Sequence, residues 1–488
     1  MKKFFILFLS ILLISTFAYA QEVTLYGYSE IEVRSEFLKD EDGVYSNTLG
    51  PISLDYWNTY FKVKAEPSSW LESYFELKMY PDFSNLFGPG IIEVQKAHLI
   101  SKSSLLTLRA YYKEDATPFD DPLQLNKPGD LPGSSWIWGN GIEVSGKVFG
   151  TNFLAGINSS DQISYVRVKK SFAPLLAGFT AMGTNWGTAN QGKSLFGVDV
   201  TGKLGPVDLK AEGIYGKCDW GTGSEGGMVL YADLSSQLNS LLKLYGTAKK
   251  VDLGYMHQFG WFKTDQTQLI PGTSGSAGTY VKIGAVVTPL SNLSIEPIVE
   301  LTNREDITEK TTEITGIVTY NPTKQVNLKG TVYNENVNGT NSTSITGEVT
   351  LKPVKNTSIY GKLHQPLEDK TGYYANIILT PLNNMTLYSS ISGGFVYDDT
   401  YNTLVYNPNV SFIFIKGDYK LARDVTLTGL YQNFKNNTEE HNTYYLALNF
   451  NNATLYYGKA PLNSDAVITE GIPVDFAKQI GAKISFDF

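Results

Sequence analysis

The sequence predicts an all-β protein, a transmembrane antiparallel up-and-down β-barrel of about 26 strands. Turns that begin with proline recur between alternating stretches, at Pro289, Pro322, Pro353 and Pro381. Apolar and polar side chains alternate with a period of two in these stretches, as they do in strands. A secretion signal opens the chain. In lipid every backbone polar group needs a partner, so a sheet there has to close on itself.

Residues 1–20 have the features of a secretory signal peptide. Lys2 and Lys3 precede an apolar stretch, and Ala18-Tyr19-Ala20 places small residues at the two positions that a signal peptidase reads. The alternative is a membrane anchor, but the apolar stretch is short for a span of about 20 residues. We therefore expect cleavage before Gln21 and a mature barrel domain that covers residues 21–488.

The composition favours strands and gives the chain an acidic balance. It contains 31 Tyr, 25 Phe and 45 Gly but a single cysteine, Cys218, which excludes an internal disulfide framework. Removal of the signal peptide takes away two lysines, leaving 38 basic and 48 acidic side chains and a net charge of −10. The mean hydropathy of −0.15 agrees with a barrel, because only every second strand residue has to be apolar.

Counting the alternating stretches gives the order of the strands. An even number between 22 and 26 places both ends on the periplasmic side, with short periplasmic turns and longer outer loops. The expected strands are 23–36, 54–65, 70–80, 91–101, 104–113, 140–148, 153–158, 162–171, 174–184, 193–203, 206–216, 226–234, 249–263, 277–288, 292–303, 310–320, 325–336, 343–352, 357–366, 371–380, 384–396, 408–420, 424–435, 441–450, 453–460 and 475–488.

The alternation separates an apolar face from a charged one. A soluble sandwich would pack the apolar face on a second sheet, whereas a membrane barrel turns it to lipid and lines water with the charged face. The secretion signal, the length without a domain break and the regular short turns favour the membrane barrel. The candidates for the lumen wall are Glu30, Glu32, Arg34, Arg109, Arg167 and Lys329.

One region lacks the strand pattern. Residues 235–246 carry Leu238, Leu241, Leu242 and Tyr245 at helical spacing, with serines before them and Gly246 at the end. This spacing predicts a short amphipathic helix at the periplasmic rim. The alternative is a poorly patterned strand.

Both ends of the mature chain resemble those of Gram-negative outer-membrane porins, the general diffusion class. The opening QEVTLYG from Gln21 to Gly27 is similar to their first strand, and IGAKISFDF ends in an aromatic residue, Phe488. The resemblance implies an outer-membrane location, recognition of Phe488 by the barrel-assembly machinery, and a homotrimer. The chain lacks the Arg-His before the last aromatic, and common porins have about 16 strands, so no subfamily follows.

In that family a long third outer loop folds into the barrel and narrows it. The corresponding connection here runs from Glu114 to Gly139, and its fragment PFDDPL resembles the acidic constriction segment without the glycine pair. The alternative is a solvated outer loop, with the arginines paired to nearby wall glutamates. The candidates for the constriction are Glu114, Asp115, Asp120, Asp121 and Asp130.

These features predict a porin, a water-filled channel for passive diffusion of small hydrophilic solutes and ions. Acidic charge favours cations or neutral solutes. About 22 strands already enclose a lumen wide enough for a plug, so inward loops and long side chains would have to fill part of it. The alternative is a structural or adhesive barrel with a filled lumen, and an active receptor would need a plug that the sequence does not show.

The sequence gives no sign of an enzyme. Its four histidines, His98, His257, His364 and His441, form no cluster with the spacing of metal ligands, and no hydrolase or nucleotide-binding motif stands in a suitable context. We therefore expect no catalytic residues, no metal, no cofactor and no nucleic-acid partner. The expected partners are outer-membrane lipid, the small solutes and the assembly machinery.

Overall fold

The structure is a computed structural model in which long strands dominate. It describes residues 22–39, 45–80, 91–125, 138–159, 162–184, 192–219, 224–255, 277–305, 307–367, 369–398, 403–436, 440–450, 452–458 and 479–487. Within these ranges no helix is long and apolar enough to cross a membrane.

The strands follow one another along the chain with short connections at one end. Their bounds are β1 Glu22–Lys39, β2 Tyr45–Leu49, β3 Ser53–Ser68, β4 Leu71–Tyr80, β5 Ile91–Lys102, β6 Leu106–Asp115, β7 Trp138–Val148, β8 Thr151–Asn158, β9 Ile163–Phe172, β10 Leu175–Thr184, β11 Gly192–Leu204, β12 Val207–Asp219, β13 Ser224–Gln237, β14 Leu242–Val251, β15 Gly278–Leu290, β16 Leu293–Arg304, β17 Glu309–Thr323, β18 Val326–Val337, β19 Thr340–Leu351, β20 Ser358–Pro366, β21 Gly372–Leu382, β22 Met385–Asp398, β23 Thr403–Ala422, β24 Val425–Lys435, β25 Glu440–Phe450, β26 Ala453–Gly458 and β27 Gln479–Asp487.

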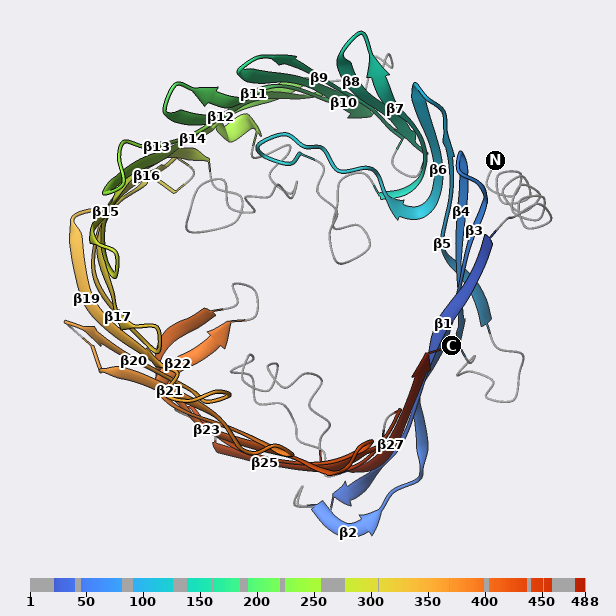
Figure 1. Cartoon of the computed structure of the whole chain (residues 1–488), viewed down its shortest axis with the longest axis vertical. Helices are drawn as coiled ribbons and strands as arrows, with labels where there is room; N and C mark the ends of the chain where they lie inside the picture. The colour runs from blue at the N-terminus through green and yellow to red at the C-terminus, as the bar shows by residue number, and fades with distance from the viewer. Residues whose placement is uncertain are drawn as a thin grey trace.

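The strands close into a single barrel (Figure 1). β27 pairs with β26 on one side and with β1 on the other, where Tyr28 lies opposite Asp487 and Glu36 opposite Gln479. β1 also pairs with β3, while β2 pairs only with the far end of β1. The barrel of the described residues therefore contains 26 antiparallel strands, which confirms the predicted fold class and strand number.

The two faces of the sheet differ as the alternation predicts. Large apolar side chains point outward and remain exposed, among them Leu25 at 61%, Val198 at 60% and Ile283 at 64%. The residues between them face the lumen and form ion pairs between neighbouring strands, such as Lys282 with Glu300 at 2.9 Å. Because the apolar row has no second sheet against it, the stacked-sheet alternative is excluded.

The predicted helix at 235–246 is wrong. β13 continues to Gln237 and β14 begins at Leu242, with a tight turn between them. The Asn239 side chain shapes this turn by accepting hydrogen bonds from the backbone N–H groups of Leu241 and Leu242, at 2.8 and 3.0 Å. The strand expected at 249–263 accordingly lies earlier, at 242–251.

Within the described residues, two elements turn into the lumen. Residues 116–125, here called the inner segment, leave the end of β6 and run along the inner face of the wall (Figure 1). The paired ends of β22 and β23, here called the inner hairpin (residues 394–398 and 403–406), also project inward (Figure 1). Pairing shifts between Gly393 and Phe395 at its base, where Gly394 has a φ of +82°. Both elements reduce the open width of the barrel.

Candidate pore constriction

Before the inner segment, an arginine on β6 lies between two glutamates. Arg109 on β6 donates hydrogen bonds to Glu143 on β7 at 3.0 Å and to Glu114 at 2.7 Å. The strand register places Arg109 directly opposite Glu143, so the first pair follows from the sheet itself. Glu114 also lies 2.9 Å from Nδ1 of His98 on β5, whose ring stacks on Tyr74. These contacts extend an ion-pair network along the wall.

Glu143 also anchors the start of the inner segment. Its carboxylate is 2% exposed and accepts hydrogen bonds from the backbone N–H and the hydroxyl of Thr117, both at 2.7 Å. It also accepts one from the Tyr165 hydroxyl at 2.6 Å. Because several donors converge on this buried carboxyl group, Glu143 holds the segment against the wall.

Asp120 reaches two cations on β9. Its carboxylate contacts Nζ of Lys169 and lies 3.4 Å from Nε of Arg167. Burial alone would raise the pKa of Asp120, but Lys169 and Arg167 outweigh it and lower the pKa below the usual range. Its side chain remains 63% exposed to the lumen. Asp120 therefore presents a negative charge to the lumen over the whole neutral range.

Arg167 itself is bound to the wall. It forms a two-pronged ion pair with Asp199 on β11 and donates to the Thr180 hydroxyl on β10 at 3.0 Å. The intervening position on β10 is Gly178, where any Cβ would overlap both Arg167 and Asp199. Glycine at this position therefore permits the ion pair to cross a whole strand.

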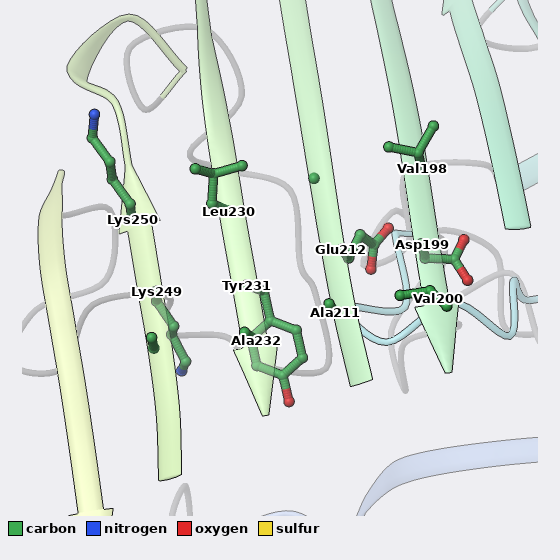
Figure 2. A pocket seen from close by; sticks show the side chains of 12 residues that line it. Val198, Asp199, Val200, Ala211, Glu212, Leu230, Tyr231, Ala232, Lys249 and Lys250 are labelled. Carbon is green, nitrogen blue, oxygen red and sulfur yellow. The ribbon is translucent and has the colours of Figure 1, made fainter. Parts of the chain in front are cut away.

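Two carboxyl groups, Glu212 of the wall and Asp121 of the segment itself, hold the middle of the inner segment. Asp199 and Glu212 lie opposite each other on β11 and β12 (Figure 2). Glu212 accepts a hydrogen bond from the backbone N–H of Leu123 at 2.8 Å, while Asp121 within the segment accepts one from Leu125 at 3.0 Å. Burial raises the pKa of the Asp121 carboxyl. Asp121 is buried and therefore serves the folding of the segment rather than the surface of the lumen.

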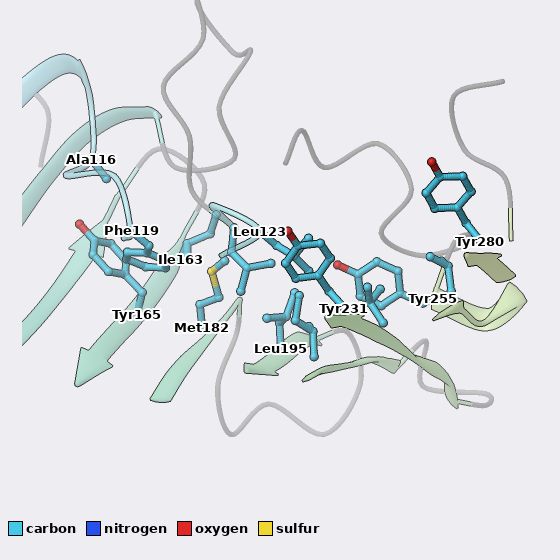
Figure 3. Close-up of a cluster of buried hydrophobic side chains, with 14 of the residues drawn as sticks. Ala116, Phe119, Leu123, Ile163, Tyr165, Met182, Leu195, Tyr231, Tyr255 and Tyr280 are labelled. Carbon is cyan, nitrogen blue, oxygen red and sulfur yellow. The ribbon is translucent and has the colours of Figure 1, made fainter. Parts of the chain in front are cut away.

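Apolar contacts complete this attachment. Phe119, Leu123 and Leu125 are at most 3% exposed. They belong to a cluster that includes Tyr165, Met182, Leu195, Tyr231 and Tyr255 from the wall and from the turn after β14 (Figure 3). Burying such side chains stabilises the inward position by roughly 1.5–3 kcal/mol each. The inner segment is thus packed like part of a protein core, which a solvated outer loop would not be.

The inner hairpin rests on aromatic contacts. His364 on β20 lies 4.8 Å from the Tyr406 ring and 6.1 Å from the Phe395 ring, measured between centroids. Nζ of Lys362 stands 4.9 Å from the Phe395 centroid. A cation above an aromatic face adds attraction to the packing. The sequence reasoning did not single out this hairpin, because its residues read as an ordinary strand end and outer loop.

The remaining lumen candidates have wall partners. Glu30 pairs with Lys483 and Glu32 accepts a hydrogen bond from Tyr456, so both connect the strands where the barrel closes. Arg34 lies 4.0 Å from Glu36, and Lys329 lies 3.3 Å from Glu348.

Of the other constriction candidates, the structure describes Asp115 but not Asp130. The backbone carbonyl of Asp115 accepts a hydrogen bond from Arg109 at 3.2 Å. Asp130 and Phe488 lie outside the described residues, as does the predicted signal peptide.

Sequence reasoning missed the wall residues that receive the inner segment. Glu143, Lys169, Asp199 and Glu212 all stand on polar rows of the predicted strands, but alternation alone gives no partner across the lumen. One of these residues could have been found from the strand register, because Arg109 and Glu143 lie opposite each other in adjacent predicted strands. In the described residues no three His, Cys, Asp or Glu side chains are arranged to hold a metal ion.

The comparisons with known proteins give similarity of fold only. No protein-family model and no curated protein matches the chain. Among solved structures, the siderophore receptor PirA from Acinetobacter baumannii is 8% identical, with 96% of this chain and 81% of that chain covered and a TM-score of 0.39. A mutant of the ferric enterobactin receptor PfeA from Pseudomonas aeruginosa, in complex with enterobactin, is 9% identical, with 95% and 81% covered and a TM-score of 0.39. The translocation pore of the P pilus usher PapC is 8% identical, with 95% and 99% covered and a TM-score of 0.36. These values are too low to support a function for this chain.

Proposed function

We propose that the protein is an outer-membrane porin, a passive channel for small hydrophilic solutes and ions. The observation that carries this proposal is the contrast between the two faces of one closed sheet. The outer face is an exposed apolar surface, and the lumen face is lined by ion pairs and tyrosine hydroxyls. Such a wall supports water rather than lipid in the lumen.

The inner segment supports a restricted passage. It brings Asp120 to the lumen side of the wall next to Lys169 and Arg167. Fixed charges in a narrow, low-dielectric passage bias the ions that enter. With the acidic balance of the chain, this favours cations and neutral solutes over anions. Assembly as a trimer remains part of the proposal.

A filled structural barrel is the second candidate. The observation in its favour is that the inner segment and the inner hairpin both pack tightly on the wall. The two candidates differ in whether solutes cross.

Swelling of liposomes that contain the purified protein distinguishes the two candidates. The porin proposal expects swelling in small neutral sugars, with a rate that falls as the sugar becomes larger. Liposomes that hold folded protein, shown by a heat-dependent shift on a gel, but swell no faster than empty ones would favour the filled barrel.

A further inference from the structure

Where the inner segment meets the wall, acidic side chains outnumber the basic ones. Asp199 and Glu212 lie opposite each other on adjacent strands, and Asp121 of the segment joins them. Arg167 is the cation in ion-pair contact with this group, and its guanidinium is already engaged by Asp199. Asp121 and Glu212 are therefore left facing each other without a positive charge between them.

The oxygen atoms of these two side chains indicate a place for a shared proton. One oxygen of each accepts a backbone N–H of the segment, from Leu125 and from Leu123. The other oxygens, Asp121 Oδ1 and Glu212 Oε1, are buried and meet no donor among the described residues. Asp121 and Glu212 are 3% and 4% exposed, so water does not solvate them freely. Two bare carboxylate oxygens in this position would repel each other, whereas one shared proton makes a hydrogen bond.

We propose that Asp121 and Glu212 form a proton-dependent latch that fixes the inner segment to the barrel wall and releases it when both carboxyl groups are ionised. The proposal deepens the proposed function, because the latched segment is the one that narrows the channel. It rests on that function only for its effect on ion flow, since the position of the segment can be measured without any current.

The direction of the pH effect follows from proton binding. The latched state holds one proton between the two carboxyl groups, and the released state exposes both to water, where they ionise at ordinary values. The latched state therefore binds more protons, and raising the pH favours release. The raised pKa of the buried Asp121 agrees with this direction. The latch is complete at low pH and is lost as the pH rises through that raised pKa.

Charged and titratable groups from three neighbouring strands surround this pair. From β9, Arg167 and Lys169 are bound to Asp199 and Asp120. From β14, Lys249 stands over the Tyr280 ring at 5.4 Å. Tyr231 on β13 and Tyr255 after β14 pack on the segment as part of the apolar cluster, and burial raises the pKa of Tyr255 further above its usual range. Tyr255 therefore does not ionise before the carboxyl pair does.

A buried reporter cysteine in the segment tests the latch. Leu125 is 2% exposed, so Leu125→Cys in a Cys218→Ala background should react slowly with a charged thiol reagent while the latch is closed. Between about pH 5 and pH 10 the labelling rate, corrected for the reactivity of the thiolate, should rise by about tenfold per pH unit through the transition. A small thiol peptide provides the correction.

Two matched variants make the test specific. Glu212→Gln keeps an oxygen for the Leu123 N–H and adds an amide that donates to Asp121, so labelling should stay slow at every pH. Asp233→Asn removes a lumen carboxylate on β13 that accepts from Thr247 at 2.9 Å and does not touch the segment, so it should follow the unsubstituted reporter.

The outcomes separate the latch from the pore. A corrected labelling rate that does not change with pH, or one that changes equally in Glu212→Gln, overturns the latch. If Leu125→Cys fails to fold, conductance of the chain without a reporter cysteine replaces it: gating that increases at high pH and disappears in Glu212→Gln supports the latch, and steady conductance overturns it. A barrel that never conducts but shows pH-dependent labelling contradicts the porin and leaves the latch supported.

Discussion

At the scale of single residues, tyrosines that lie across glycines join neighbouring strands on the lumen face. In each joint the glycine is directly opposite the tyrosine in the strand register, and a Cβ on the glycine would overlap the ring. An aromatic ring that covers a glycine restores contacts which the glycine itself does not make. The lumen joints are Tyr111 with Gly141, Tyr165 with Gly156, Tyr245 with Gly284, and Tyr456 with Gly481.

The joint at the closing strands predicts a stability effect. Gly481→Val would displace the Tyr456 ring and break its hydrogen bond to Glu32, which spans β27. We expect a loss of about 1–3 kcal/mol, seen as a lower temperature for the heat-dependent gel shift of the barrel. Gly330→Val is the control, because nothing lies within 4 Å of a Cβ there. If the two variants are equally resistant to heat, the contact between Tyr456 and Gly481 does not stabilise the barrel.

Asp120 predicts an effect on ion selectivity. Asp120→Asn leaves Lys169 and Arg167 without their lumen-side carboxylate, so the reversal potential in a salt gradient should move toward anions. Because the pKa of Asp120 is lowered, the unsubstituted channel should keep its preference as the pH falls through the usual carboxyl range, and lose it only below that range. An unchanged reversal potential in Asp120→Asn would show that ions pass elsewhere.

At the scale of elements, the sequence predicts strands well and local exceptions poorly. Alternation identifies a strand because each face has one environment, so the predicted strand number matched although one strand, expected at 249–263, lies at 242–251. At 238–245 the leucines have helical spacing for another reason: Leu238 and Leu241 occupy a turn, and Leu244 points outward. Hydrogen bonds from neighbouring strands decide the conformation there, and no local pattern contains that information.

The inner hairpin predicts a change in conductance. Gly394 has a φ of +82°, and a Cβ there would lie 3.0 Å from the Cα of Gly372. Gly394→Val is therefore strained in the inward bend, and we expect the hairpin to straighten and the single-channel conductance to rise. Gly429→Val on β24, where a Cβ meets nothing within 4 Å, should conduct like the unsubstituted chain. Unchanged conductance in Gly394→Val would mean that the hairpin does not limit flow.

At the scale of the whole molecule, the inward position of the inner segment depends on contacts between residues far apart in sequence. The sequence shows the cluster of acidic residues after β6 and predicts that it faces the arginines of the lumen wall. The structure pairs those arginines largely with wall carboxylates, and uses Asp121 to fold the segment. Glu212 lies 89 residues from Leu123, so only the closed barrel brings them together.

Ion conductance across a planar lipid bilayer tests the central claim most directly, that one closed sheet presents apolar side chains to lipid and encloses a water-filled lumen. The account predicts discrete current steps that are linear in voltage and increase with salt concentration. Protein that inserts and shows the heat-dependent shift of a folded barrel, yet gives no steps above the background of the bare membrane, would contradict it.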